Sequence, residues 1–368
     1  MKKITINTKA LLNAVANANN YTSKDGDFAG AITIIGNDGQ LEVKATDMIQ
    51  TIIFKNIGFI SSDLTNPNFD AVSLDGKKLA TVLKAAKSDE VIIELSNGFI
   101  TIKSNRSRAK IETREKVQEI EIAQSYGKKL ELDGCIEMMD SMIHAIDQNN
   151  PKYELNGLLI EMENGTVNMV ATDTRRLALV SDTIEGNDEV NIIIPKQAVI
   201  TATKLFSDVE IEAEADSVLF SIHSDFASYS TKLISGSFPD YQRIIPKDFS
   251  QTVQLDAKSL VEVVTKASMF NNDIIISIQN QVLSAKDTDG NTEAYMPEEE
   301  TMDPQVKIFF AVDSKYILDV ISSSGEKTVD LCFNEQNIPL VLKAGKLKEV
   351  IMPIQLPDAL EEDIQEAA

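Results

Sequence analysis

The sequence predicts an α+β protein made of three copies of one domain, each with two helices packed on antiparallel sheets. The main observation is a strand-like segment that recurs three times and ends in Asp each time, at residues 41–47, 167–173 and 281–287. The steps between these aspartates are 126 and 114 residues. Because solenoid units repeat every ~20 to 50 residues, a period of this length indicates a repeated domain.

A second series of strands gives the same register independently. Apolar residues alternate at three places, and the steps from Val91 to Val209 and on to Val329 are 118 and 120 residues. The alternating residues are Val91, Ile93 and Leu95; Val209, Ile211 and Ala213; and Val329, Leu331 and Phe333. Turns are expected after them, at Asn97-Gly98, near Asp216 and near Gln336-Asn337. Strands that alternate between helices without a βαβ rhythm indicate antiparallel sheets.

Each copy is expected to hold two helices and about eight short strands. In the first copy the helices are residues 8–20 and a segment capped by Asp75. In the second copy they are residues 133–146 and a segment whose first turn contains Pro195. In the third copy Asp256 and Asp313 are the expected N-caps.

Five of these helices, all but the one at residues 8–20, are assigned an apolar stripe at helical spacing, which predicts the face that packs on the sheet. The stripes are Leu79, Val82, Leu83 and Ala86; Ile136, Met139, Ile143 and Ile146; Val199, Ala202 and Phe206; Leu260, Val263, Val264 and Ala267; and Ile317, Val320 and Ile321. The expected domains are residues 1–124, 125–249 and 250–356, followed by an acidic tail at 357–368. Joined edge to edge in one arc, they would place all six helices on one concave side.

Composition indicates a soluble globular protein of the reducing cytoplasm, with 43% hydrophobic residues and a net charge of −22. Cys135 and Cys332 are too few for a disulfide framework or a zinc motif, and each fits a small buried apolar position. Polar residues interrupt the weakly signal-like N-terminus, and no segment reaches the ~18 apolar residues of a membrane helix. If the negative charge is spread evenly over the surface, it argues against nonspecific adhesion to nucleic acid or membrane.

The basic residues are not evenly spread. The predicted helical segments 8–20, 76–88 and 195–207 contain seven lysines and neither Asp nor Glu. These lysines are Lys9, Lys77, Lys78, Lys84, Lys87, Lys196 and Lys204. One interpretation is a solvated face, as for any single basic helix. The other, favoured by three equivalent acid-free helices, is a weakly basic concave surface that holds a polyanion by its phosphates.

Four motifs carry a resemblance to a known family. They are LNG at residues 155–157, ATDTRRLA at 171–178, GSFPDYQRIIP at 236–246 and VIMPI at 350–354. Together they resemble the bacterial DNA polymerase III β subunits, the sliding clamps, over residues 1–356. The resemblance implies three DNA-clamp domains per subunit and a head-to-tail homodimer ring, with helices lining a hole around double-stranded DNA. It also implies a non-catalytic accessory subunit of a DNA-directed DNA polymerase, with no cofactor and no metal.

The family's partners are the replicative DNA polymerase, the clamp loader and other proteins with a clamp-binding motif, which insert a hydrophobic peptide between the second and third domains. Carried over by position, the resemblance implies an apolar wall of Leu155, Thr172, Leu177, Pro239, Ile244, Val350, Ile351, Met352 and Pro353. It places Thr174, Arg175, Arg176 and Arg243 at the polar margin. Apolar side chains with a flexible Met suit a pocket that accepts several related peptides.

The resemblance also implies residues that face the duplex. Lys24, Asn149, Lys152 and Tyr153 match positions where family members touch DNA, and the lysines of the acid-free helices add Lys77, Lys84, Lys87, Lys196 and Lys204. Tyr153 is suited either to stacking or to packing.

The chain departs from the family pattern at two places. Thr174-Arg175 stands where Gly-His is common, and Gln355 replaces an Arg before the tail at 357–368. Leu360 and Ile364 permit a short amphipathic helix that regulates the groove, while a frayed terminus is the alternative.

Two other classes of function are alternatives to a clamp. An enzyme is disfavoured because His144 and His223 belong to no nucleophile or metal motif and Gly345-Lys346 lacks the rest of a phosphate loop. A triplicated protein-binding scaffold that never meets DNA is the other alternative, and a ring that stays on circular DNA distinguishes the clamp from it.

Overall fold

The computed structural model describes residues 2–62, 68–96, 98–122, 127–130, 132, 134–184, 189–296, 308–335 and 338–356. The chain divides into two compact units, one formed by residues 1–133 with 206–233 and the other by residues 134–205 with 234–368. The turn residues Asn97 and Gln336-Asn337, the helix start at Asp133 and the tail at 357–368 were predicted from sequence and lie outside the described residues.

Unit 1 contains a twelve-stranded antiparallel sheet with eight strands of the first copy and four of the second. The first eight are β1 (Lys2–Asn7), β2 (Ala31–Asn37), β3 (Gln40–Thr46), β4 (Gln50–Ser62), β5 (Phe69–Asp75), β6 (Glu90–Ser96), β7 (Phe99–Ser104) and β8 (Ser107–Glu112). The other four are β9 (Lys128–Leu130), β14 (Glu212–Ala215), β15 (Leu219–His223) and β16 (Ala227–Lys232). Neighbours run in the order β8-β7-β6-β1-β4-β16-β15-β14-β9, and β2, β3 and β5 pair beside that path.

Unit 2 contains an eight-stranded sheet and a four-stranded sheet. The larger has the order β13-β10-β11-β12-β24-β23-β22-β17, and the smaller β20-β19-β18-β21. The strands of the second copy are β10 (Gly157–Glu163), β11 (Thr166–Thr172), β12 (Arg176–Thr183) and β13 (Val190–Pro195). Those of the third copy are β17 (Gln251–Asp256), β18 (Asp273–Gln279), β19 (Val282–Asp287), β20 (Glu293–Tyr295), β21 (Ile308–Asp313), β22 (Thr328–Phe333), β23 (Leu340–Ala344) and β24 (Leu347–Ile351).

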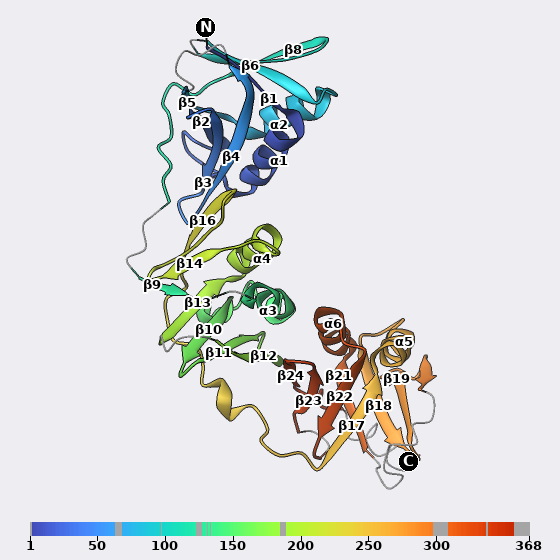
Figure 1. Cartoon of the computed structure of the whole chain (residues 1–368). Coiled ribbons are helices and arrows are strands. Elements are labelled where there is room, and N and C mark those ends of the chain that lie inside the picture. The colour runs from blue at the N-terminus through green and yellow to red at the C-terminus, as the bar shows by residue number, and fades with distance from the viewer. Residues whose placement is uncertain are drawn as a thin grey trace. The chain divides into compact units, whose positions relative to one another are not determined.

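Six α-helices occur among the described residues, two per copy, as predicted. They are α1 (Thr8–Ala18), α2 (Gly76–Ala85), α3 (Cys135–Met142), α4 (Lys196–Phe206), α5 (Ala257–Ala267) and α6 (Ser314–Ser324). Asp75, Asp256 and Asp313 cap α2, α5 and α6 by accepting a hydrogen bond from a first-turn amide. In Figure 1, α1 with α2, and α5 with α6, lie side by side against the strands of their own copy. None of the described helices is long and apolar enough to cross a membrane.

The core follows the predicted stripes, because alternate strand residues and one face of each helix are removed from water. Leu79 and Leu83 of α2, and Val263 and Val264 of α5, are buried, while Val82 and Ala86 of the first-copy stripe are only half-buried. Cys135 and Cys332 are buried free thiols, as expected.

Some predicted boundaries were wrong by a few residues. Val209 and Ile211 precede β14, which begins at Glu212, and Val209 is exposed instead of facing the core. Pro195 is the last residue of β13 rather than the first turn of α4. Lys87 lies beyond the end of α2 with a positive φ of 47°.

Strand pairing joins successive copies at their edges. β4 of the first copy pairs with β16 of the second inside unit 1, and β12 of the second copy pairs with β24 of the third inside unit 2. These two pairings, which we call the first and second junctions, confirm the predicted edge-to-edge joining of copies. The candidate site lies at the second junction.

Candidate functional site

The loop at residues 172–176 connects β11 to β12 and is fixed by its own side chains. Asp173 Oδ1 accepts hydrogen bonds from the backbone nitrogens of Arg175 and Arg176, at 3.0 Å each. Thr172 Oγ1 donates to the Arg176 carbonyl at 2.5 Å, and Thr174 has a positive φ of 78°. This Asx turn explains why the ATD motif ends in Asp. It leaves the side chains of Thr174 and Arg175 exposed.

Beside this loop, β24 continues from the third copy. The backbone nitrogen of Met352 donates to the Arg175 carbonyl at 2.9 Å, and Leu177 lies directly opposite Val350 in the strand register. Leu177 and Val350 are buried in one apolar cluster with Tyr241. Of the predicted wall residues, Leu177 and Val350 are therefore the floor of the site, each at most 3% exposed. Leu155 and Ile351 are also buried, but Ile351 lies opposite Arg176 and so faces the other side of the sheet.

The segment between the second and third copies packs across this cluster. Ile234, Phe238, Ile245 and Phe249 are the partly buried residues packed against it. Tyr241 is anchored by a hydrogen bond from its hydroxyl to Glu161 Oε2 at 2.7 Å. Burial, reinforced by that carboxylate, raises the pKa of Tyr241 to about 12. The segment is thus held to the sheet through one neutral phenol.

The remaining predicted groove residues surround this floor. Pro239, Arg243, Ile244 and Met352 are exposed, and Thr172 and Pro353 are half-buried. Arg243 Nε contacts Asp240 Oδ2 at 2.6 Å, an exposed pair that contributes little to stability. Segments 172–177, 239–244 and 350–353, far apart in sequence, thus combine an apolar floor with exposed apolar and cationic side chains. Such a surface suits a short apolar peptide.

Arg176 was predicted at the polar margin, and that placement was wrong. Its side chain is 3% exposed, and it points beneath the loop into a cluster of carboxylates. Its guanidinium lies 3.0 Å from Asp173 Oδ2, 2.8 Å from Asp319 Oδ2 and 3.5 Å from Glu349 Oε1. The five donors of a guanidinium can bind several acceptors at once, which explains the burial of this cation.

The ionic cluster around Arg176 also includes His144. Arg176 Nη2 donates to the His144 carbonyl at 2.6 Å, and the His144 ring binds Glu349 Oε2 at 2.6 Å and the Ser323 hydroxyl at 3.1 Å. Burial lowers the pKa of Arg176, but Glu349, Asp319 and Asp173 outweigh it, so the pKa is raised and the cation is retained. The cluster ties the loop at 172–176 to α6 and β24 of the third copy.

A second loop, at residues 147–156, presents the predicted duplex-facing residues of the second copy. Asn149, Lys152 and Tyr153 are exposed, and Tyr153 has 77% of its surface accessible. Asp147 Oδ1 accepts from the backbone nitrogens of Gln148 and Asn149. Burial raises the pKa of Asp147, but hydrogen bonds from Asn149, Asn150 and Gln148 outweigh it and lower that pKa.

The predicted duplex-facing lysines differ in how free they are. Lys24, Lys77, Lys84, Lys87 and Lys204 are exposed. Lys196 is half-buried instead, and its ammonium donates to the Ile146 carbonyl at 2.6 Å. Burial, followed by the nearby positive charge of Arg176, lowers the pKa of Lys196. Lys196 therefore supports the backbone before the loop at 147–156 instead of projecting into solvent.

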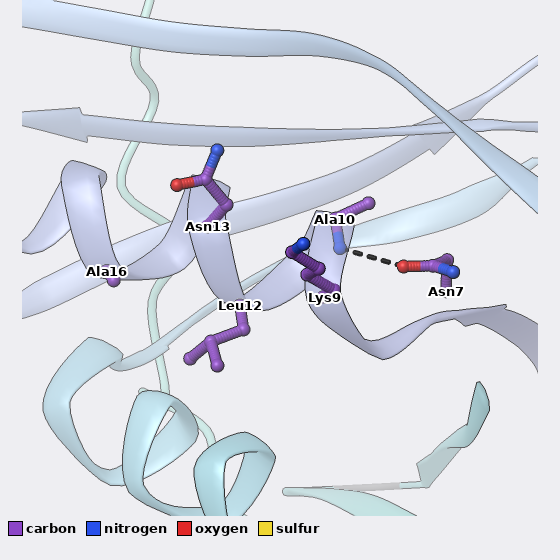
Figure 2. A pocket seen from close by; sticks show the side chains of 6 residues that line it. All are labelled: Asn7, Lys9, Ala10, Leu12, Asn13 and Ala16. Atoms are coloured by element: carbon purple, nitrogen blue, oxygen red, sulfur yellow. Dashed lines mark hydrogen bonds between the residues drawn. The ribbon is translucent and has the colours of Figure 1, made fainter. Parts of the chain in front are cut away.

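The acid-free helix α1 carries a surface depression of about 620 Å³. Figure 2 shows the side chains that line it, with Asn7 Oδ1 accepting from Ala10 N at 2.9 Å. The lining residues are Asn7, Lys9, Ala10, Leu12, Asn13 and Ala16. Its polar groups are amides and one ammonium, which agrees with a surface that meets phosphates loosely.

Sequence reasoning missed several residues that shape the site. Asp319 and Glu349 contact Arg176 across 143 and 173 residues of sequence, and no local signal marks them. Asn156 lies in the LNG motif and Tyr241 in the motif at residues 236–246, but the sequence predicted no role for either. Among the described residues, no group of three or more His, Cys, Asp or Glu side chains is arranged to hold a metal ion.

Comparison with known families identifies two matching regions. The profile described as DNA polymerase III beta subunit, central domain, matches residues 129–240. The profile described as DNA polymerase III beta subunit, C-terminal domain, matches residues 242–355. Together they cover more than half of the chain, including the loops at residues 147–156 and 172–176 and strand β24.

Individual proteins agree with these profiles. The chain is 24% identical over 307 residues to the beta sliding clamp of Helicobacter pylori, covering 77% of this chain and 82% of that protein. It is 25% identical over 350 residues to that of Pseudomonas aeruginosa, covering 86% and 89%. The crystal structure of the H. pylori beta clamp bound to DNA ligase peptide superposes with a TM-score of 0.87 at 23% identity, over 96% of this chain and all of that one. A P. aeruginosa sliding clamp with ligand gives 0.85 at 20% identity, over 97% and 100%.

Proposed function

The chain belongs to the family of bacterial DNA polymerase III beta subunits, and we propose that it is a sliding clamp that tethers a replicative polymerase to duplex DNA. The observation that carries the proposal is the second junction, where the two matched regions meet in one sheet. A sliding clamp is a non-catalytic processivity subunit. We therefore assign no reaction, cofactor or metal to the chain.

The proposed partner site is the apolar floor of Leu177 and Val350 with its exposed surroundings. A partner peptide would bury apolar side chains between the loop at 172–176, the segment at 239–244 and Met352. The H. pylori relative was crystallised with a DNA ligase peptide, which supports a peptide as the ligand. The clamp loader and other partners with similar peptides would compete for the same groove, because one floor accepts one peptide.

The proposed duplex-facing surface is weakly basic. It would use exposed Lys24, Lys77, Lys84 and Lys204 together with Asn149, Lys152 and Tyr153. Phosphate contacts hold a duplex without reading its sequence, and a ring needs little affinity because topology retains it. Lys196 is expected to act indirectly, through the Ile146 carbonyl.

The proposed ring is a head-to-tail homodimer. Two sheet edges suit such a contact: β8 carries exposed Arg108 and Lys110, and β20 carries Glu293 and an exposed Tyr295. Met269 and Phe270, 66% and 76% exposed, follow α5, which packs on β20. We propose that β8 of one subunit pairs with β20 of the next, because each is an end strand of its sheet among the described residues and because exposed apolar side chains favour association. The three domains 1–124, 125–249 and 250–356 in one arc, and a cytoplasmic location, belong to this proposal.

The test is retention on circular DNA. Labelled protein is loaded onto a nicked circular plasmid by its clamp loader and separated by gel filtration. We expect co-elution that is lost when the plasmid is linearised, because a ring slides off a free end. Retention that survives linearisation would indicate direct binding, and no retention together with a monomeric mass would favour the protein-binding scaffold.

A further inference from the structure

The loop at residues 147–156 carries both the buried Leu155, which the proposed groove includes in its wall, and the exposed residues Lys152 and Tyr153. Only one residue separates Tyr153 from Leu155 along the chain. The local structure decides whether these two surfaces move independently or together.

A single side chain, that of Asn156, closes this loop. Asn156 Oδ1 accepts from the backbone nitrogen of Asn150 at 2.8 Å, and Asn156 Nδ2 donates to the Asn150 carbonyl at 3.0 Å. Asn150 Oδ1 in turn accepts from the backbone nitrogen of Lys152 at 3.0 Å, and Asn150 Nδ2 donates to Asp147 at 3.1 Å. One amide thus holds both ends of the segment that contains Lys152, Tyr153 and Leu155.

The backbone of Asn156 is fixed as well. Its carbonyl accepts from the backbone nitrogen of Lys196 at 3.2 Å, at the start of α4. The next residue must be Gly157, because a Cβ there would lie 2.6 Å from the Ile194 carbonyl oxygen. Strand β10 and helix α4 therefore hold Asn156 in place, while the loop that it closes projects outward.

The first copy closes its corresponding loop differently. Gly76 N donates to the Gly30 carbonyl at 3.1 Å, as Lys196 N does to the Asn156 carbonyl, so Gly30 occupies the position of Asn156 and has no side chain. The loop at 23–30, which carries Lys24, closes by a backbone hydrogen bond from Gly30 to Ser23 at 2.9 Å. The third copy again has an Asn at this position, because Ser314 N donates to the Asn272 carbonyl at 2.9 Å.

We propose that Asn156 is a positioning residue shared by the partner groove and the duplex-facing loop, and that through it the duplex and the partner peptide bind cooperatively. A duplex that contacts Lys152 or Tyr153 favours one position of this hydrogen-bonded loop, and the bonds from Asn156 carry that preference to the backbone at Leu155. The inference rests on the proposed function, because both ligands are those of a sliding clamp.

The experiment measures coupling between two probes on the full-length protein. The peptide probe is the fluorescein-labelled DNA ligase peptide of the H. pylori complex, and its affinity is measured by anisotropy with and without a saturating 24-base-pair duplex. We expect the duplex to tighten peptide binding by about fivefold or more, with the reciprocal effect of peptide on duplex. In Asn156→Ala the ratio of peptide affinities with and without duplex should fall to one, and each probe alone should bind more weakly.

Matched variants distinguish coupling from loss of structure. Lys152→Ala should lower the ratio, because the duplex then contacts the loop through Tyr153 alone, whereas Asn272→Ala, at the corresponding exposed position of the third copy, should leave the ratio intact. If Asn156→Ala does not fold, Asn156→Asp keeps the acceptor and removes the donor, and should retain only part of the ratio.

The inference is overturned if the natural chain shows no duplex effect, or if folded Asn156→Ala keeps the full ratio. Failure of the natural chain to bind either probe would contradict the proposed function itself. That outcome is separable from the others because it is seen before any variant is made.

Discussion

At the first junction β4 pairs with β16, and at the second β12 pairs with β24, each after a loop of the same form. Thr46 Oγ1 donates to the Gln50 carbonyl at 2.9 Å, and Asp47 Oδ1 accepts from Ile49 N and Gln50 N. Met48 has a φ of 74°, as Thr174 has 78° in the second loop. The backbone was thus retained at both junctions, and their differences lie in the side chains.

Two positions show the difference. At the first position, the pair Gln50 and Thr231 of the first junction corresponds to Arg176 and Ile351 of the second. At the next position, the pair Thr51 and Ser230 corresponds to Leu177 and Val350. The first junction therefore has a polar pair where the second has its apolar floor.

The hydrogen bonding below the loops differs in charge. Gln50 accepts from the Tyr229 hydroxyl at 2.5 Å, and Tyr21 packs edge-on against Tyr229 at 5.8 Å. In the second junction Arg176 and Glu349 fill the positions of Gln50 and Tyr229. A neutral junction is sufficient to join two copies. The charged one additionally fixes a loop at the proposed groove.

The largest effect is expected from removing the buried cation. Arg176→Met leaves Glu349 and Asp319 without their partner and should destabilise the second junction by about 3 to 5 kcal/mol. Gln50→Met at the first junction breaks one neutral hydrogen bond and should cost about 1 kcal/mol. Native-state hydrogen exchange of the amides in β12 and β24, compared with those in β4 and β16, measures both. Equal losses of stability in the two variants would contradict the proposed difference between the charged and the neutral junction.

The next effect concerns peptide affinity. Leu177→Thr combined with Val350→Ser gives the second junction the polar pair of the first. Loss of one buried aliphatic contact is worth about 1.5 to 3 kcal/mol, so affinity for the DNA ligase peptide should fall by about 10- to 100-fold.

The matched control for that exchange is Thr51→Leu with Ser230→Val. It should create no peptide binding at the first junction, because the groove also needs the segment containing Phe238 and Tyr241, which packs on the floor at the second. Fluorescence anisotropy with the same peptide measures both exchanges. A gain of binding in the control would show that the floor alone makes the groove.

A smaller effect depends on pH. Tyr241 has a folded pKa of about 12, above its ordinary value of 10, so the unfolded chain loses this proton first as pH rises. The stabilisation is therefore present below pH 10 and lost between pH 10 and about 12. Tyr241→Phe should remove this dependence and cost about 1 kcal/mol at neutral pH through the lost bond to Glu161. Urea unfolding of unit 2 at pH 8 and 11 measures the loss of stability between these pH values. If Tyr241→Phe loses as much stability as the natural chain, Tyr241 is not the group responsible.

The smallest effect is expected at the tip of the first loop. Met48 and Ile49 are 72% and 57% exposed, so replacing them with the Thr and Arg of the second loop should change stability by no more than about 0.5 kcal/mol. Peptide affinity should be unaffected. A loss of partner binding in this variant would place a partner at the first junction and break the comparison.

Much of the fold could be predicted because its signals are local. The stripes of α5 and α6 and the caps Asp256 and Asp313 depend on spacing within about two helical turns, and all were confirmed. Strand ends were less predictable: Val209 continues an apolar alternation although β14 starts at Glu212. Pairing with β9 and β15, rather than the pattern of side chains, determines where that strand begins.

The candidate site was predicted in outline through motifs, yet the roles of its charged residues were not. Arg176 and Lys196 were predicted to be exposed cations, because most lysines and arginines in proteins are exposed. Both are held inward by hydrogen-bond acceptors that cannot be predicted from the neighbouring sequence. The acceptors are Glu349 and Asp319 for Arg176, and the Ile146 carbonyl for Lys196.

The amino-acid order alone was enough to establish the threefold repeat, the α+β class and the family, since these follow from periodicity and motifs along the chain. Folding in three dimensions determined that one Arg is the buried centre of a junction and that Asn156 closes the loop at residues 147–156. The physical reason is that burial and hydrogen bonding depend on which distant segments meet. Strand register brings residue 176 to residue 349, and spacing along the chain does not.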